Sequence, residues 1–264
     1  MMNGLRAEGY KLFHARIFWA LIIIASFLSL AMTSLIYLDE KGILIEQITV
    51  ETGMEESLTG FTMLIESLVE PDAFFIFLFA ALLSSFFVAG EYTNGTIKNI
   101  VSTGSKRLII HVNKFIVIWG ATILVLLTMV LTFTLFSSIY FGFGTFPTAA
   151  EWTVAGKSFG LTCLIIGAYS GIATCLAMIA RNAAVAIFAL LGFYLVFSTG
   201  IDMLAYRYTI FEDLLRYSVF DYMRNLSLLD EGIDNFVSRL VSTAIVTIVL
   251  FVGAGVLLFQ RKDI

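Results

Sequence analysis

Six long apolar runs dominate this sequence of 264 residues and limit the folds that it can adopt. A helix needs about 20 residues, with a usual range of about 17–25, to cross the hydrocarbon core of a bilayer. Because unpaired backbone groups are costly in lipid, each run is predicted to be helical. The sequence therefore predicts an all-α integral membrane protein with six transmembrane helices in a single transmembrane domain, residues 1–264. The runs cover approximately residues 17–38, 73–89, 115–141, 158–180, 182–201 and 240–259, and none contains Lys, Arg, Asp, Glu or His.

The composition agrees with this class. Hydrophobic residues make up 59% of the chain and charged residues only 14%, whereas a soluble domain has about 25% charged residues. The two cysteines, Cys163 and Cys175, lie in one apolar run. Twelve residues apart on one helix they cannot approach each other, so no disulfide is expected between them.

Charged residues are segregated between the two sides that six spans define. The side with both termini carries ten basic and three acidic residues, whereas the other side carries six basic and seventeen acidic residues. Basic residues concentrate in cytoplasmic loops. Both termini and residues 90–114 are therefore predicted to be cytoplasmic, and the chain is expected in a cell membrane, namely a bacterial plasma membrane.

Three segments outside the runs have amphipathic patterns. Residues 3–16 mix apolar and basic side chains, which predicts a helix on the membrane surface that leads into the first span. Residues 58–69 predict a short helix on the outer side, ended by Pro71. Residues 202–239 fit one or two short helices that either dip into the outer leaflet or lie on the surface, and the pattern leaves both possibilities open.

A polar and basic island between the second and third runs is the remaining compact feature. Within it Ile97, Ile100 and Val101 are spaced to share one face of a short helix, predicted over residues 93–103. Two interpretations remain open. The helix is either a docking element for a cytoplasmic partner or an ordinary interfacial helix on lipid headgroups.

The chain offers little chemistry of its own. Gly156-Lys157-Ser158 matches the end of a phosphate-binding loop, but Glu151 occupies its first glycine position. His14 and His111 lie in separate flanks without ligand or catalytic partners. Ion-coupled carriers usually keep ionisable residues inside the bilayer, and the six runs have none. An enzyme is therefore disfavoured, and active transport would need energy from another protein.

The chain resembles the permease subunits of type-2 ABC transporters. The resemblance covers the whole chain and includes the amphipathic N-terminal helix and the six runs. It also includes the exit of the second run, Gly90-Glu91-Tyr92-Thr93-Asn94-Gly95-Thr96. It continues with Ser102, Lys106-Arg107 and Lys114, and with the ending Phe259-Gln260-Arg261-Lys262-Asp263-Ile264. It implies a permease domain that pairs with a second permease copy, as a homodimer or heterodimer, and with two copies of a cytoplasmic ABC ATPase. ATP and Mg would bind the ATPase, this chain would hold no cofactor, and no nucleic acid partner is expected.

The resemblance also implies roles for individual residues. Residues 93–103 would be the coupling helix, and Glu91 would be a hinge or polar contact. The residues expected to dock on the ATPase are Thr93, Gly95, Thr96, Ile97, Lys98, Ile100 and Val101. The first and fifth spans would face their counterparts across the pathway. The side chains expected to line that pathway are Phe27, Met32, Tyr37, Phe188, Phe193, Tyr194 and Phe197.

These pathway candidates are apolar and aromatic, which favours a hydrophobic or amphipathic cargo. An antimicrobial or membrane-active peptide is the first expectation for an ATP-driven exporter of this kind. The alternatives are a lipid or small-drug exporter subunit, or a membrane sensor or assembly subunit that transports nothing.

Overall fold

The computed structural model describes residues 2–43, 58–97, 107–208, 210–211, 217–226 and 235–261. In this part of the chain the regular structure is entirely helical. Six of its helices are long and apolar enough to cross a membrane, which confirms the predicted all-α multi-pass class. These candidate spans are Arg16–Glu40, Ala73–Thr93, Arg107–Phe141, Ala149–Ala180, Ala183–Ala205 and Phe236–Gln260.

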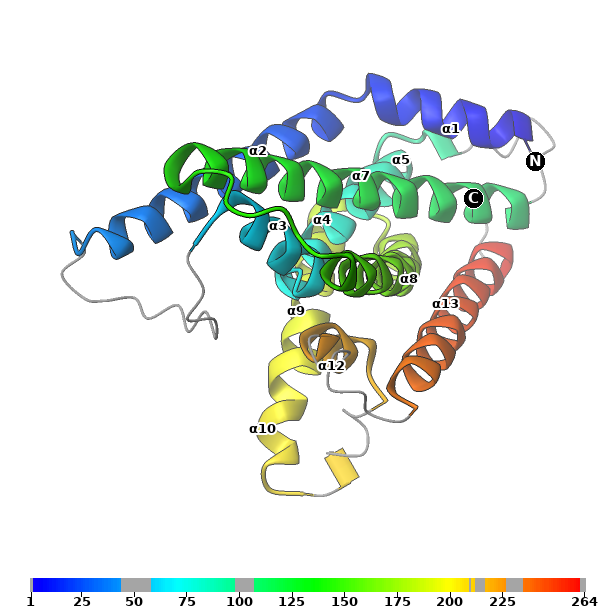
Figure 1. Cartoon of the computed structure of the whole chain (residues 1–264). Coiled ribbons are helices and arrows are strands. Elements are labelled where there is room, and N and C mark those ends of the chain that lie inside the picture. Colours follow the sequence, from blue (N-terminus) through cyan, green and yellow to red (C-terminus); the bar gives the residue numbers. More distant parts are fainter. Residues whose placement is uncertain are drawn as a thin grey trace.

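Figure 1 shows the helical elements in their order along the chain. The first half contains α1 (Met2–His14), α2 (Arg16–Glu40), α3 (Gly60–Val69), α4 (Ala73–Ser84), η1 (Ser85–Ala89) and α5 (Gly90–Thr93). The second half contains α7 (Arg107–Phe141), α8 (Ala149–Ala180), α9 (Ala183–Leu195), η2 (Val196–Gly200), α10 (Ile201–Ala205), α12 (Val219–Arg224) and α13 (Phe236–Arg261). The elements η1 and η2 are π-helical turns inside the second and fifth spans.

Polar side chains cap the ends of several helices. Asp72 caps α4, and Thr148 forms a capping box with Glu151 at the start of α8. Such side chains satisfy backbone N–H groups that have no partner within the helix. Arg181 adopts a left-handed conformation with φ 54°, and Asn182 caps α9. These two residues form a tight turn between the fourth and fifth spans.

Helix α8 is the centre of the bundle. In the most apolar 18-residue stretch of α8, 72% is buried inside the chain, compared with 22% in the corresponding stretches of α2 and α13. A Cβ added to Gly167 would lie 3.1 Å from side-chain atoms of both Trp119 and Ile248. The small residues of α8 thus allow close packing of α7 and α13 within the chain, a common use of glycine between membrane helices.

One end of the bundle is closed by α3 and α12. The N–H of Gly60 in α3 donates to the carbonyl of Gly142 at 2.8 Å, and Ser158 of α8 donates to Val69 O at 3.0 Å. Helix α3 stops just before Pro71, as predicted. Four residues of α12 are buried, so this short helix packs into the bundle.

The other end, which we call the α1 end, gathers segments that are far apart in the sequence. Figure 1 shows α1 along the top, close to α5 and the start of α7, with α10 and α12 at the bottom. Arg107 donates to the carbonyls of Phe259 and Gln260, each at 3.0 Å, which joins the start of α7 to the end of α13. Thr93 Oγ1 lies 3.4 Å from Arg181 O, in the turn between α8 and α9.

Candidate functional site

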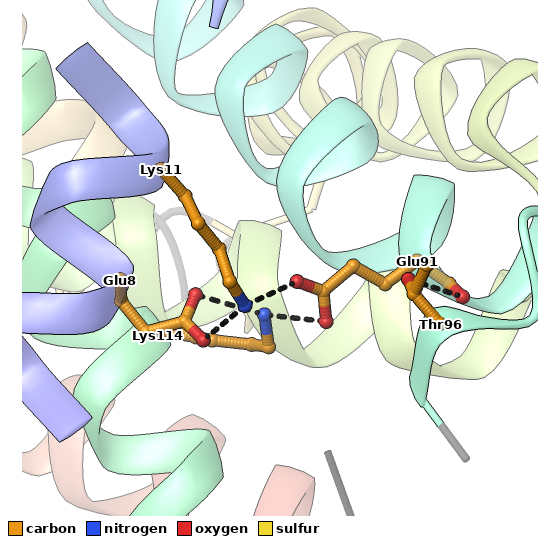
Figure 2. Close-up of polar contacts among 5 residues, drawn as sticks. All are labelled: Glu8, Lys11, Glu91, Thr96 and Lys114. Carbon is orange, nitrogen blue, oxygen red and sulfur yellow. Dashed lines mark hydrogen bonds and ion pairs between the residues drawn. The ribbon is translucent and has the colours of Figure 1, made fainter. Parts of the chain in front are cut away.

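Four charged side chains from three helices form a closed ring at the α1 end. Glu8 and Lys11 come from α1, Glu91 from α5 and Lys114 from α7, as Figure 2 shows. Lys114 Nζ lies 3.1 Å from Glu8 Oε2 and 2.7 Å from Glu91 Oε2. Lys11 Nζ lies 2.8 Å from Glu8 Oε1 and 3.2 Å from Glu91 Oε1. Each carboxylate therefore bridges both ammonium groups, and we call these four residues the charge ring.

The charge ring has a buried side and an open side. The exposed fraction of the side chain is 1% for Lys114, 10% for Glu8, 14% for Glu91 and 42% for Lys11. A buried charge without a partner is strongly destabilising. Lys114 is therefore the inner anchor of the ring, whereas Lys11 is its solvent-facing member.

Local structure explains how each helix supplies its charge. Glu8 and Lys11 are three residues apart on α1, so they lie on the same face of that helix. Glu91 follows the π-turn η1, where the N–H of Gly90 reaches back to Ser85 O. A π-turn contains more residues than an α-turn and so changes the direction in which the next side chains point. The ring thus clamps α1, the end of the second span and the start of the third.

The pKa values of the two α1 residues are consistent with a charged ring. Burial raises the pKa of Glu8, but Lys114 and Lys11 together outweigh it, so the pKa lies below its usual value of 4.5. Burial lowers the pKa of Lys11, but Glu8 and Glu91 outweigh it, so the pKa lies above its usual value of 10.5. Both residues are therefore charged at neutral pH.

Two further polar side chains of α7 are buried beside Lys114. His111 packs against Gly255 of α13, where an added Cβ would collide with the imidazole ring. Asn113 packs against Gly4 of α1, where an added Cβ would lie 2.5 Å from Asn113 Nδ2. The glycines thus allow α1 and α13 to approach α7 closely. In the described part of the chain, no three His, Cys, Asp or Glu residues are grouped so that they could hold a metal ion.

The predicted docking segment begins two residues after Glu91. Thr93 ends α5, and Gly95 has φ 70° in the turn that follows, so helical structure resumes at Thr96 and not at residue 93. Thr96 Oγ1 donates to the backbone carbonyl of Glu91 at 3.3 Å (Figure 2). Residues 93–96 are exposed, whereas Ile97 is buried in a cluster with residues of α1, α2 and α7.

Not all of the expected docking residues can be placed. Lys98, Ile100 and Val101 lie outside the described residues. The docking role of residues 93–103 therefore stays a prediction. Of its described residues, 93–96 are exposed, and the Ile97 side chain is buried against the bundle.

Three of the seven expected pathway residues pack against the rest of the chain: Tyr194 is buried, whereas Phe193 and Phe197 are half-buried. Phe193 and Phe197 stack with ring centroids 4.4 Å apart, and Tyr194 lies 5.5 Å from the ring of Phe220. Phe220 belongs to α12 and is itself buried. These aromatic residues hold α9, η2 and α12 together.

The other four expected pathway residues lie elsewhere. Phe27 and Met32 of α2 and Phe188 of α9 are exposed on the outside of the chain. Tyr37 stacks on Tyr140 of α7 with ring centroids 4.8 Å apart. The structure thus does not bring the seven residues to one common surface within a single chain.

Most of the charge ring was not predicted from the sequence. Glu91 was expected to make a polar contact, but its partners were not identified, since Lys11 lies 80 residues away. The signal that was present is the balance of charges: Glu8 and Glu91 are two of only three acidic residues on a side with ten basic ones.

Comparison with known families gives one match. The model of the family described as "Protein of unknown function (DUF2705)" matches residues 21–264, and the chain belongs to this family. No ABC transporter family was detected, so the identification with type-2 ABC permeases is wrong. The short motifs that suggested it, such as Gly-Glu-Tyr-Thr-Asn-Gly-Thr, are brief and polar. The length of each apolar run follows from bilayer thickness and is shared by unrelated membrane proteins. No curated protein matches the chain.

Proposed function

We propose that this chain is a membrane subunit that moves a hydrophobic or amphipathic cargo with energy from a separate, ATP-hydrolysing cytoplasmic protein. The α1 end would face the cytoplasm, because the basic residues of the sequence concentrate there. The partner would contact the exposed residues 93–96 and the segment that follows them.

The charge ring is the observation that carries this proposal. Glu91 lies two residues before the exposed segment, and Thr96 donates back to its carbonyl. The carboxylate of Glu91 is paired with Lys114 of α7 and Lys11 of α1. A displacement of residues 93–96 would therefore act on the second span, the third span and the surface helix together.

The arrangement favours an external energy source. The charged groups of the ring lie at one end of the spans, whereas the six apolar runs carry no Lys, Arg, Asp, Glu or His. An ion-coupled carrier would be expected to move charge through the membrane interior. The incomplete phosphate-binding loop at Gly156 gives the chain no evident means to use ATP itself.

A second copy of the chain would complete the pathway. Phe27, Met32 and Phe188 point outward from α2 and α9, two of the spans that are least covered by the rest of the chain. Two copies facing each other through these spans would enclose an apolar and aromatic path. Such a path suits a membrane-active peptide, a lipid or a small drug.

The alternative is a sensor or assembly subunit that transports nothing. It is favoured by Phe193, Tyr194 and Phe197, whose rings pack against one another and against Phe220 of α12. In this case residues 93–96 would bind a regulator, and the charge ring would transmit the resulting displacement to the second and third spans.

The docking proposal is tested by purification of the tagged full-length chain from its native membrane. Thr96→Trp adds bulk to the exposed segment and removes the hydrogen bond to the Glu91 carbonyl, but it replaces none of the four ring side chains. Thr153→Trp is the control, because Thr153 is an exposed threonine of α8 that also donates to a backbone carbonyl. We expect ATP hydrolysis to co-purify with the wild type and with Thr153→Trp, and to be lost with Thr96→Trp. Hydrolysis that survives Thr96→Trp unchanged, or is absent from the wild-type preparation, contradicts the proposal.

A further inference from the structure

Helix α1 has two distinct faces. Its inner face carries Glu8 and Leu12, both buried, and packs on α7. Its outer face is exposed and continues past the break at Ala15 onto the first turn of α2. We call this surface the α1 outer face, and it consists of Arg6, Tyr10, Phe13, His14, Arg16 and Trp19.

The α1 outer face is positively charged because the charge ring removes the only acidic residue of α1 from it. Glu8 points inward and is paired with Lys11 and Lys114. Arg6 and Arg16 are exposed, and neither forms an ion pair with an acidic residue among those that the structure describes. The charges of the two guanidinium groups are thus available to an outside ligand.

The aromatic part of the α1 outer face is held in place. Trp19 Nε1 donates to the carbonyl of Phe13 at 2.8 Å, which fixes the corner between α1 and α2. The rings of Tyr10 and His14 stack with centroids 3.8 Å apart. Because the charge ring clamps the opposite face of α1 to the bundle, the outer face cannot turn inward.

We propose that the α1 outer face is a binding site for the headgroups of anionic phospholipids. Arginine suits phosphate because its planar donors can form two parallel hydrogen bonds. Aromatic side chains such as Tyr and Trp favour the headgroup level of a membrane. The position identifies the occupant: Arg16 is the first residue of the first span, so the outer face lies where that span leaves the hydrocarbon core.

The proposal is tested by native mass spectrometry of the full-length chain in micelles that contain equal amounts of phosphatidylglycerol and phosphatidylcholine with identical acyl chains. The wild type should retain phosphatidylglycerol in preference. Arg6→Gln combined with Arg16→Gln should lower the ratio of the two retained lipids by about 30-fold, at roughly fivefold for each basic residue. Arg207→Gln combined with Arg239→Gln, two exposed arginines outside α1, is the control and should leave the ratio unchanged.

Two further arms separate the possible sources of the signal. Arg6→Lys combined with Arg16→Lys keeps the charge and should preserve most of the preference, which shows that the loss in the glutamine variant reflects charge and not misfolding. Added inorganic phosphate at the lipid concentration should not displace the lipid. Equal retention of both lipids by the wild type, an unchanged ratio in the glutamine variant, or displacement by phosphate alone would overturn the proposal.

Discussion

Replacement of Lys114 by methionine is the perturbation whose effect follows most directly from the structure. The Lys114 side chain is 1% exposed and lies within 3.1 Å of Glu8 and 2.7 Å of Glu91. Its removal leaves two largely buried carboxylates with Lys11 as their remaining shared partner. Loss of one member of a buried ion pair typically costs about 3–5 kcal/mol of unfolding free energy. We expect Lys114→Met to fall in this range.

The same reasoning gives a much smaller effect for Lys11. Its side chain is 42% exposed, so solvent screens its contacts with Glu8 and Glu91. Exposed pairs contribute about 0–1 kcal/mol, and Lys11→Met should cost no more than this. Glu8→Gln and Glu91→Gln, introduced together with Lys114→Met, should recover most of the lost stability, because no unpaired buried charge then remains.

The assay is equilibrium unfolding of the purified chain in mixed micelles, followed by circular dichroism as the denaturing detergent is increased. Lys157→Met is the matched control, since Lys157 is an exposed lysine of α8. The reasoning about the charge ring is refuted if Lys114→Met and Lys157→Met lower the unfolding free energy equally. It is also refuted if the triple variant is no more stable than Lys114→Met alone.

Two other predictions concern stability. The pKa of Glu8 is lowered from 4.5 in the folded chain, so its pairing stabilises the fold above that pH and is lost as the pH falls below it. Unfolding free energies measured from pH 6 to about pH 3 should therefore fall more steeply for the wild type than for Glu8→Gln, and parallel curves would argue against the pairing. Gly255→Ala should destabilise by about 1–3 kcal/mol, because the new methyl group meets the buried His111 ring. Gly253→Ala, with open space around it, should be neutral or stabilise by up to about 1 kcal/mol, and thermal unfolding of both variants checks this difference.

The spans could be predicted because a bilayer imposes a length and a composition on every helix that crosses it. The observed helices contain the predicted runs, except that Asn182 caps the fifth span and lies outside it, and each span extends beyond its run at one end or both. The third, for example, begins at Arg107 and not near residue 115. Its first turns carry His111, Asn113 and Lys114, which hydropathy assigns to a loop. They are helical because α1 and α13 cover these polar side chains.

The charge ring could not be predicted with its partners, because ion pairs between distant helices leave no periodic pattern. Only the spacing of Glu8 and Lys11 is local. The contacts of Lys114 with Glu8 and Glu91 depend on how three helices pack. That packing depends in turn on features such as the π-turn η1 and the approach of Gly4 to α7, which single-sequence reasoning does not detect.

The expected pathway residues show a second limit. Hydrophobicity and aromatic character identified side chains of the first and fifth spans, but they did not distinguish outward residues such as Phe188 from packed ones such as Tyr194. In a membrane both environments are apolar, so composition carries no signal for which face meets lipid and which meets protein.

The central claim is tested most directly by a transport measurement. The full-length chain and the protein that co-purifies with it are placed in vesicles, and movement of a fluorescently labelled amphipathic peptide is followed. The account predicts movement that requires both the partner and ATP and that is abolished by Thr96→Trp. Movement driven by a proton or sodium gradient, in vesicles that contain this chain but neither partner nor ATP, would contradict it.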